Sequence, residues 1–402
     1  MRKIITITAL LLALLSADAM AQKKEIAQAR TYIKSGKDFD KAEQLMVSVL
    51  QNDSAGRHNK RVYQLLFESV RLQYEAANEK VYLKQSNDTA AICNLTSRLF
   101  AVATLLDSVD ALPDRKGRIR PEYRKGNAEE LNTLRPNLYL GGTYNIKQAD
   151  YLTAFRFFDL YIGCDSLPLF TGYNYRQTDA FIPVAAYWAT FCGYKLAQPT
   201  LTLKYAEQAL RDTSKTSYTL QYMAEAYRIA GDTAAYVKTL TQGFQANPEF
   251  VYFFPRLIEY YTAAGQLERA LQTAEEALQT NPHSELFLFA KSTTLLHLQQ
   301  YDECIAVSDT LIARNDSLAE PYFNAGTACL NQALALEQKQ NPRLYRNPIR
   351  QLYQKARPYM EHYRQLAPDE KDKWAPALYR IYLNLNMGRQ FEEIDGILNR
   401  KQ

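Results

Sequence analysis

Apolar residues in the centre of the chain recur with the spacing of paired amphipathic helices. One face of a helix expected to follow residue 251 carries Phe254, Leu257, Ile258 and Tyr261. Gly265 comes next, a residue type that commonly ends helices. Pro255 is compatible only with the first helical turn, so we expect this helix to begin late. A second stretch has small residues on one face and ends at Pro282. The pattern predicts two helices joined by a short turn.

This two-helix pattern repeats every 34 residues. Pro248 and Pro282 are 34 residues apart, and so are Gly231 and Gly265. Blocks that begin at residues 183, 217, 251, 285 and 319 keep the same phase, and the last contains an insertion over about 333–349. Because a single helical pair cannot bury its apolar face, such pairs stack on one another. The repeat therefore predicts an all-α stack of helical hairpins, one of which the insertion lengthens.

The repeat resembles a known family. Its length, together with Tyr261, Gly265, Ala270, Ala277 and Pro282, is similar to the tetratricopeptide repeat (TPR). The resemblance is strong over residues 183–332 and moderate over most of the remainder. It implies an all-α fold, a right-handed superhelical solenoid of helix–turn–helix repeats. The chain as a whole resembles the exported TPR proteins of Bacteroidetes-type bacteria.

Four segments are expected along the chain. Residues 1–21 form a signal peptide, 22–112 degenerate TPR-like helices, 113–136 a basic linker, and 137–402 the TPR array. The array contains the insertion near 333–349 and ends in capping helices. The linker carries six basic residues, Arg115, Lys116, Arg118, Arg120, Arg124 and Lys125. It is interpreted as a solvated loop; the alternative is a docking site for an acidic partner, an anionic lipid or a glycan.

The N-terminus has the pattern of a secretory signal peptide. Arg2 and Lys3 precede an uncharged run over residues 4–15, and residues 19–21 have the small-x-small pattern of a cleavage site. The run is shorter than the ~20 apolar residues that cross a bilayer, and no later segment is apolar enough to do so. We therefore expect cleavage between Ala21 and Gln22, a periplasmic or secreted location, and no transmembrane segment in the mature chain.

An Asp-Ser or Asp-Thr pair followed by a small or aliphatic residue occurs seven times. The hydroxyl residues of these triplets are Ser54, Thr89, Ser108, Ser166, Thr233, Thr310 and Ser317. The triplet resembles the O-glycosylation acceptor of exported proteins in Bacteroidetes-type bacteria, which predicts modified hydroxyls. The alternative is helix capping, because Asp, Ser and Thr collect at helix starts and turns.

Composition and missing motifs exclude several classes of protein function. Hydrophobic residues are 47% and charged residues 23% of the 402 residues, so a packed core is expected and disorder is not. The net charge of +5 is too small to indicate a nucleic-acid binder. The sequence patterns of P-loop, dinucleotide-binding, zinc-protease and α/β-hydrolase sites are missing, and the four histidines are scattered. No catalytic residue, metal site or cofactor is predicted; a hydrolase built on a helical array is the least favoured alternative.

The five cysteines include no Cys-x-x-Cys pair. Cys304 and Cys329 take positions at which the repeat packs its neighbouring helices, so both are predicted to be buried. Cys164 and Cys192 are one candidate pair for a disulfide, which the sequence does not establish.

The family resemblance also implies a binding surface. In TPR proteins the first helix of each repeat lines the concave groove. Carried onto this chain, that rule selects Tyr187, Phe191, Tyr194, Tyr218, Tyr222, Arg228, Tyr252, Arg256, Glu259, Phe289, Phe323 and Asn324. Aromatic and arginine side chains are the usual anchors of protein interfaces. The alternative is that some of these tyrosines pack between helices.

These observations predict a non-catalytic protein–protein interaction scaffold of the bacterial cell envelope, which binds a partner segment in the concave groove. The lysine and asparagine clamp of chaperone-binding TPR proteins is missing at matching positions, so a C-terminal acidic peptide is not the expected ligand. A glycan- or peptidoglycan-binding accessory protein is the alternative, because aromatic rings stack on sugars. The sequence predicts neither the identity of the partner nor the oligomeric state.

Overall fold

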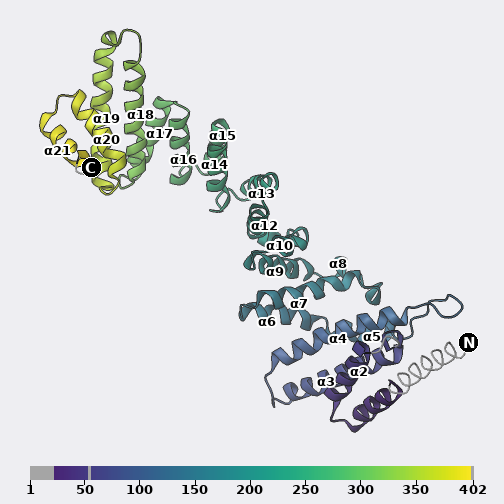
Figure 1. Ribbon diagram of the computed structural model, residues 1–402. Helices are drawn as coiled ribbons and strands as arrows, with labels where there is room; N and C mark the ends of the chain where they lie inside the picture. The colour runs from purple at the N-terminus through teal and green to yellow at the C-terminus, as the bar shows by residue number, and fades with distance from the viewer. Residues whose placement is uncertain (1–21, 53–55, 400–402) are drawn as a thin grey trace, which may run out of the picture. The chain divides into compact units, whose positions relative to one another are not determined.

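The computed structural model describes residues 22–52 and 56–399 (Figure 1). Throughout these residues the regular structure is helical, with no strand. The predicted all-α fold is therefore confirmed. The predicted signal peptide, its cleavage point after Ala21 and the Ser54 triplet lie outside the described residues.

The 34-residue period is present in the helices themselves. Helix α13 begins at Thr233, α15 at Leu267 and α17 at Tyr301, so successive second helices start 34 residues apart. Gly231 and Gly265 both have positive φ, 74° and 68°, just past the end of a first helix. A residue with a Cβ would be strained there, which explains glycine at both positions.

The chain forms two compact units, residues 1–236 and 237–402. The boundary falls inside α13 (Thr233–Ala246) and coincides with none of the predicted segment boundaries. In the first unit, one hydrophobic core includes buried residues from Ala29 to Tyr222, on both sides of the predicted linker. The helices before and after the linker therefore belong to one packed body.

In the first unit, a helix over residues 22–35 precedes the labelled helices. These are α2 (Phe39–Asn52), α3 (Lys60–Tyr82), α4 (Thr89–Asp110), α5 (Arg124–Leu134), α6 (Pro136–Lys147), α7 (Tyr151–Gly163), α8 (Tyr175–Thr178), α9 (Ile182–Lys195), α10 (Pro199–Lys204), α11 (Ala206–Ala209) and α12 (Thr216–Ala230). Helices α3 and α4 are the longest of these and lie in the segment predicted to form degenerate TPR-like helices. Half of the segment predicted as a linker is helix α5, because Ala128 and Leu131 bury their side chains in the core. Within that segment, residues 113–123 and residue 135 lie outside the helices.

The expectation that no segment after the N-terminal run is apolar enough to cross a membrane was wrong for one helix. By length and composition α4 passes that test, the single such helix in the described part of the chain. Of the most apolar 18-residue stretch of this helix, 44% is buried inside the protein. Leu99, Phe100 and Leu106 are almost completely buried, and α4 contacts α3 and α6. Its apolar composition is accounted for by core packing.

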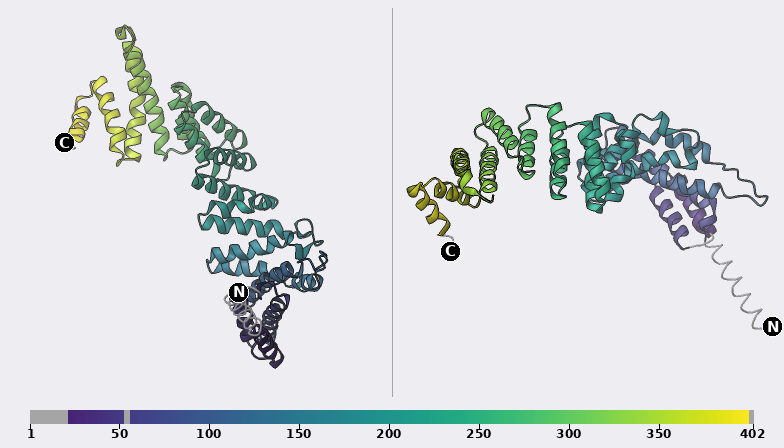
Figure 2. Two further views of the ribbon diagram at one scale, coloured as in Figure 1. Left: turned by 45° about the vertical axis from the view of Figure 1, so that its right-hand side comes forward. Right: turned by 90° about the horizontal axis from the view of Figure 1, so that it is seen from above.

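In the second unit, the helices form successive antiparallel pairs (Figures 1 and 2). They are α14 (Phe253–Ala263), α15 (Leu267–Thr280), α16 (Glu285–His297), α17 (Tyr301–Arg314), α18 (Ala319–Glu337), α19 (Arg346–Leu366), α20 (Lys371–Asn384) and α21 (Gly388–Asn399). Pro255 is the third residue of α14, within its first turn, as predicted. The insertion lengthens α18 and α19 to 19 and 21 residues, so this hairpin extends past α17, as Figure 2 shows.

The cysteines are buried and unpaired. All five lie within the described residues and none forms a disulfide, so the candidate pair Cys164–Cys192 is not formed. Cys304 and Cys329 are fully buried, as predicted. Burial raises the pKa of Cys164 and Cys192 to about 12 and that of Cys329 to about 11, which leaves little reactive thiolate at neutral pH.

We therefore predict that the native protein resists thiol reagents. Titration with a coloured disulfide reagent at neutral pH is expected to modify less than one thiol per chain over minutes, and all five after unfolding in guanidinium chloride. Absorbance of the released thiolate measures both values. Rapid native reaction of two or more thiols would contradict the burial of these side chains.

Candidate functional site

Helices α9 and α12 place a set of aromatic side chains on one surface of the first unit. Four aromatic residues of α9 lie at positions 187, 188, 191 and 194. Position 191 is three or four residues from each of the others, so helical geometry brings the other three next to it on one side. Helix α12 contributes Tyr222, and Tyr151 begins α7. We call Tyr151, Tyr187, Trp188, Phe191, Tyr194 and Tyr222 the aromatic cluster.

The rings of the aromatic cluster contact one another directly. The Tyr222 ring stacks on Tyr194 with centroids 4.5 Å apart and lies 5.8 Å from Phe191. Phe191 makes edge contacts with Trp188 at 5.6 Å and with Tyr151 at 5.9 Å. Ring pairs at these separations add a favourable energy beyond simple area burial. The cluster therefore holds its side chains in defined positions.

The cluster has a buried part and a half-exposed part. Tyr187 and Tyr222 are each 7% exposed, and their hydroxyls lie 3.4 Å apart. Burial, reinforced by the Tyr187 hydroxyl, raises the pKa of Tyr222, so this phenol is neutral at physiological pH. Tyr151, Trp188, Phe191 and Tyr194 keep part of their rings accessible. The outcome is a preformed, uncharged aromatic surface.

Two lysines lie at the edge of this surface. The Lys195 ammonium lies 5.6 Å from the centre of the Phe191 ring, and the Lys215 ammonium 5.9 Å from that of Tyr187. A cation over an aromatic face is attracted by the negative charge density of the ring. The surface therefore combines an apolar centre with cations at its margin.

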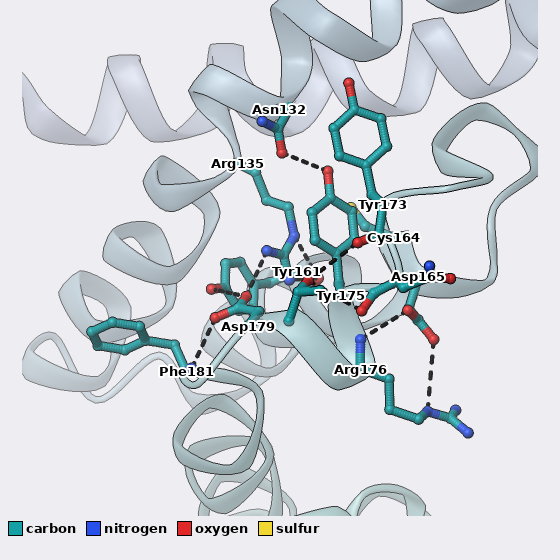
Figure 3. Close-up of polar contacts among 12 residues, drawn as sticks. Asn132, Arg135, Tyr161, Cys164, Asp165, Tyr173, Tyr175, Arg176, Asp179 and Phe181 are labelled. Carbon is teal, nitrogen blue, oxygen red and sulfur yellow. Dashed lines mark hydrogen bonds and ion pairs between the residues drawn. The ribbon is translucent and has the colours of Figure 1, made fainter.

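A buried polar cluster holds the start of α9 in place (Figure 3). Arg135, between α5 and α6, forms an ion pair with Asp179 through an Nη1–Oδ2 contact of 2.6 Å. The guanidinium also donates to the Tyr161 carbonyl at 3.3 and 3.1 Å. Its centre lies 3.8 Å from the Tyr161 ring centre and 3.9 Å from that of Tyr175. The side chains of Arg135 and Asp179 are only 6% and 13% exposed.

Asp179 connects this cluster to α9. Its Oδ2 accepts a hydrogen bond from the Tyr161 hydroxyl at 2.6 Å, and its Oδ1 accepts from the Phe181 N–H at 2.8 Å, at the start of the helix. Burial alone would raise the pKa of the carboxyl. The hydrogen bonds from Tyr161, Arg135 and Phe181 outweigh burial and hold that pKa below its ordinary value. Because the carboxylate stays ionised, α9 and its aromatic side chains are fixed against α6 and α7.

The structure brings part of the predicted groove together. Tyr187, Phe191, Tyr194 and Tyr222 are in ring contact in the aromatic cluster. Tyr218 is 46% exposed on α12, and Arg228 forms an ion pair with Glu225. Trp188 and Tyr151 belong to the aromatic cluster but were not among the predicted groove residues. The groove rule selected one face of the first helices only, whereas Trp188 is at the margin of that face and Tyr151 is on a second helix.

The predicted groove residues of the second unit have separate environments. Tyr252 is buried, and the Arg256 guanidinium lies 3.8 Å from the centre of its ring. Glu259 is exposed on α14, Phe289 lines a pocket of about 300 Å³, and Phe323 packs on Tyr363 with centroids 5.1 Å apart. These contacts do not assemble a second aromatic cluster within the described residues.

Asn324 corrects the groove prediction. Its side chain is 4% exposed, and its amide donates to the Ser292 hydroxyl at 3.1 Å and the Thr293 hydroxyl at 3.0 Å. A buried amide needs such partners, and the preceding hairpin supplies them. Asn324 therefore joins α16 and α18 and does not face a partner.

Helix starts and turns account for four of the six described triplets: two begin with a capping Asp, the Ser166 triplet begins in a short 3-10 helix, and the Ser317 triplet begins in a turn. The carboxylates of Asp88 and Asp232 accept hydrogen bonds from the N–H groups of Ala91 and Ala235, each at 2.9 Å, as N-caps do. The triplets at Ser108 and Thr310 lie inside helices instead. All six hydroxyl residues are on the exposed surface: Thr89, Ser108, Ser166, Thr233, Thr310 and Ser317.

The described side chains form no group of three or more His, Cys, Asp or Glu that could hold a metal ion. The His362 ring stacks on Tyr322 with centroids 5.2 Å apart, and its Nδ1 lies 3.2 Å from the Pro358 carbonyl oxygen. This histidine has a packing role.

Comparison with known proteins yields weak similarities to repeat proteins. No protein-family model and no curated protein matches the chain. The C-terminal part of a TPR repeat-containing protein from Cytophaga hutchinsonii aligns at a TM-score of 0.45 and 13% identity, over 64% of this chain and 92% of that one. A TPR repeats protein from Bacteroides fragilis aligns at a TM-score of 0.32 and 16% identity, over 65% of this chain and 98% of that one. Yeast Tom70 aligns at a TM-score of 0.34 and 12% identity, over 95% of this chain and 91% of that one. TM-scores and identities this low support no further conclusion. The description of stacked hairpins is therefore taken from the helices of this chain alone, and no family is assigned.

Proposed function

We propose that this chain is a non-catalytic scaffold of the bacterial cell envelope that binds a segment of a partner protein. The aromatic cluster on α9 and α12 carries this proposal. Accessible aromatic side chains that are already ordered are typical binding hot spots, because little conformational entropy is lost when a partner covers them.

The form of the cluster favours a protein segment. Trp188, Phe191 and Tyr194 offer ring faces and edges for apolar side chains, while Lys195 and Lys215 are placed to meet carboxylates or carbonyl oxygens of the same segment. Apolar anchors with a polar margin are the usual anatomy of a protein interface.

The envelope location rests on the predicted signal peptide and the Asp-Ser/Thr triplets. The exposure of all six described hydroxyls supports their modification, because a transferase needs access to the acceptor. Export across the inner membrane would place the aromatic cluster where envelope proteins can reach it.

Loss of two cluster rings is expected to weaken partner binding strongly. A photoreactive amino acid at Phe191 in living cells should first capture a discrete protein, identified by mass spectrometry; Arg156, exposed on α7, is the comparison position. The Trp188→Ala/Tyr194→Ala variant should then bind that protein at least about 30-fold more weakly, the loss of a typical hot spot. Tyr82→Ala, which removes an 84% exposed ring outside the cluster, should bind normally.

Two results would contradict the proposal. One is equal affinity of the Trp188→Ala/Tyr194→Ala and Tyr82→Ala variants for the captured protein. The other is binding of purified protein to cell-wall sacculi that requires Trp188, with no protein adduct at Phe191. The second result would favour the glycan-binding alternative.

A further inference from the structure

The lengthened hairpin of the second unit has a surface that its neighbour does not cover. Helix α17 has 14 residues and begins at Tyr301, whereas α18 and α19 have 19 and 21 residues. The outer turns of α18 and α19 therefore continue past α17 (Figures 1 and 2). A hollow of about 590 Å³ lies between α18 and α19, next to the start of α17. Elsewhere in the unit, α16 packs against α15, and α18 packs against α17.

Both helices line this hollow with the same periodicity. Helix α18 contributes Gln332, Ala335, Leu336 and Lys339, and α19 contributes Pro348, Gln351, Leu352 and Lys355. Spacings of three and four residues form a continuous ridge along a helix, and two such ridges form a groove that accepts a third helix. Leu336 and Leu352 are half-buried, while Ala335 and Pro348 are exposed, so the floor is apolar and accessible. We call this surface the α18–α19 groove.

The hairpin around the groove is strongly basic. From residue 338 to residue 360 it carries six basic residues and no acidic residue: Lys339, Arg343, Arg346, Arg350, Lys355 and Arg357. Lys339 lies 4.9 Å from the centre of the Tyr345 ring. The one carboxylate on the described lining, Asp302, accepts a hydrogen bond from Gln332 at 2.8 Å. Arg357 lies 3.9 Å from Glu361 of the same helix, whereas Lys339 and Lys355 line the groove itself, so a partner on this groove would meet positive charge.

We propose that the α18–α19 groove binds an amphipathic helix of a partner protein that carries acidic residues beside its apolar face. The bound helix packs against the extended hairpin as α17 packs against the inner part of α18. Lys339 is seven positions after Gln332, which corresponds to about 10 Å along the axis of α18. The groove is therefore long enough for about two turns of the bound helix. Lys339 and Lys355 lie near opposite ends of the groove and meet carboxylates at the two ends of those turns.

The shape of the groove distinguishes this ligand from other polyanions. A membrane surface or a nucleic acid needs exposed cations but gains nothing from a recessed apolar floor between two helical ridges. An amphipathic helix uses both features, because its apolar stripe covers Leu336 and Leu352 while its flanks meet the lysines. No residue of the aromatic cluster lines the α18–α19 groove, so this proposal stands independently of the function proposed above.

Selection from displayed helices tests this proposal with the full chain. The first library contains peptides of about 14 residues with apolar positions at i, i+3, i+4 and i+7 and acidic flanks; the second has the same apolar positions and basic flanks. We expect clones to enrich from the acidic library only. Fluorescence anisotropy of a labelled clone should show at least about tenfold weaker binding to Lys339→Glu/Lys355→Glu and to Leu336→Glu.

The hairpin offers a matched control with the same change in charge. Arg346→Glu/Arg350→Glu alters two cations of α19 that do not line the groove, and it should retain most of the affinity. Fluorescence of Trp374, 2% exposed in the same unit, reports whether each variant is folded. Trp188→Ala/Tyr194→Ala should bind the peptide normally, so failure of the proposed function and failure of this proposal are separable.

Four outcomes would overturn the proposal. These are no enrichment from the acidic library, equal enrichment from the basic library, unchanged affinity of the groove variants, or an equal loss in the Arg346→Glu/Arg350→Glu control. Binding to phosphatidylglycerol vesicles that depends on Lys339 and Lys355, without any peptide binding, would also reject it and indicate a membrane surface instead.

Discussion

Replacing Arg135 by methionine is expected to lower the free energy of unfolding of the first unit by about 3–5 kcal/mol. The change leaves the Asp179 carboxylate buried without its counter-charge, which is more costly than losing an exposed ion pair. Methionine preserves an unbranched apolar stem, so the loss reports mainly charge and hydrogen bonds. Urea unfolding of a Trp374→Phe chain, followed by the fluorescence of Trp188, measures the first unit, because the chain has two tryptophans and only Trp188 lies there.

Two further variants test the cause of that loss. Arg176→Met removes an exposed ion pair in which Arg176 Nε lies 3.6 Å from Asp165 Oδ2, and it should cost less than about 1 kcal/mol. Arg135→Met/Asp179→Leu removes both buried charges and should recover most of the stability. A cost for Arg176→Met equal to that for Arg135→Met, or no recovery in the double variant, would contradict the buried-pair argument.

The same ion pair has a defined pH dependence. The folded-state pKa of Asp179 is lower than the ordinary carboxyl value of about 3.9. Its contribution to stability is therefore fully present above that ordinary value and is lost as pH falls through the lower folded-state pKa. The difference in unfolding free energy between wild type and Arg135→Met should accordingly shrink between about pH 5 and about pH 2. A difference that stays constant over this range would contradict the assignment.

Gly193→Ala is expected to destabilise the first unit by about 3 kcal/mol, at the upper end of typical overpacking costs. A Cβ at Gly193 would lie 2.3 Å from the Thr202 nitrogen and 2.6 Å from its Cα. These are backbone atoms of α10, so no side-chain rotation can relieve the clash and the two helices must move apart. Because α9 carries most of the aromatic cluster, the variant should also shift the emission of Trp188. Urea unfolding of the Trp374→Phe chain measures both effects.

Gly163→Ala is the matched control. Gly163 is the last residue of α7, has helical dihedral angles, and would place its Cβ in open space. The substitution should raise the free energy of unfolding by about 0.5–1 kcal/mol, because alanine loses less backbone entropy on folding than glycine. A similar destabilisation by both substitutions would show that the close approach of α9 and α10 is not the cause.

The candidate site could be predicted only in part. Helical spacing and the family resemblance selected Tyr187, Phe191, Tyr194 and Tyr222, which do come together. They did not select Trp188, which contacts Phe191 within α9, or Tyr151, whose place depends on how α7 and α9 pack. The same rule placed Asn324 at the surface, although Ser292 and Thr293 of the preceding hairpin enclose it. Position along one helix does not specify what the neighbouring hairpin covers.

The sequence by itself determined the helices and their period. Apolar spacing, the glycines at positive φ and the late start at Pro255 are local properties, set within a few residues of each other. Only the tertiary structure decided which aromatic rings remain accessible, where the chain divides into units, and that Arg135 meets Asp179 across 44 residues. The physical reason is that burial and ion pairing depend on side chains from separate helices. Their proximity results from stacking of the hairpins, which no local pattern encodes.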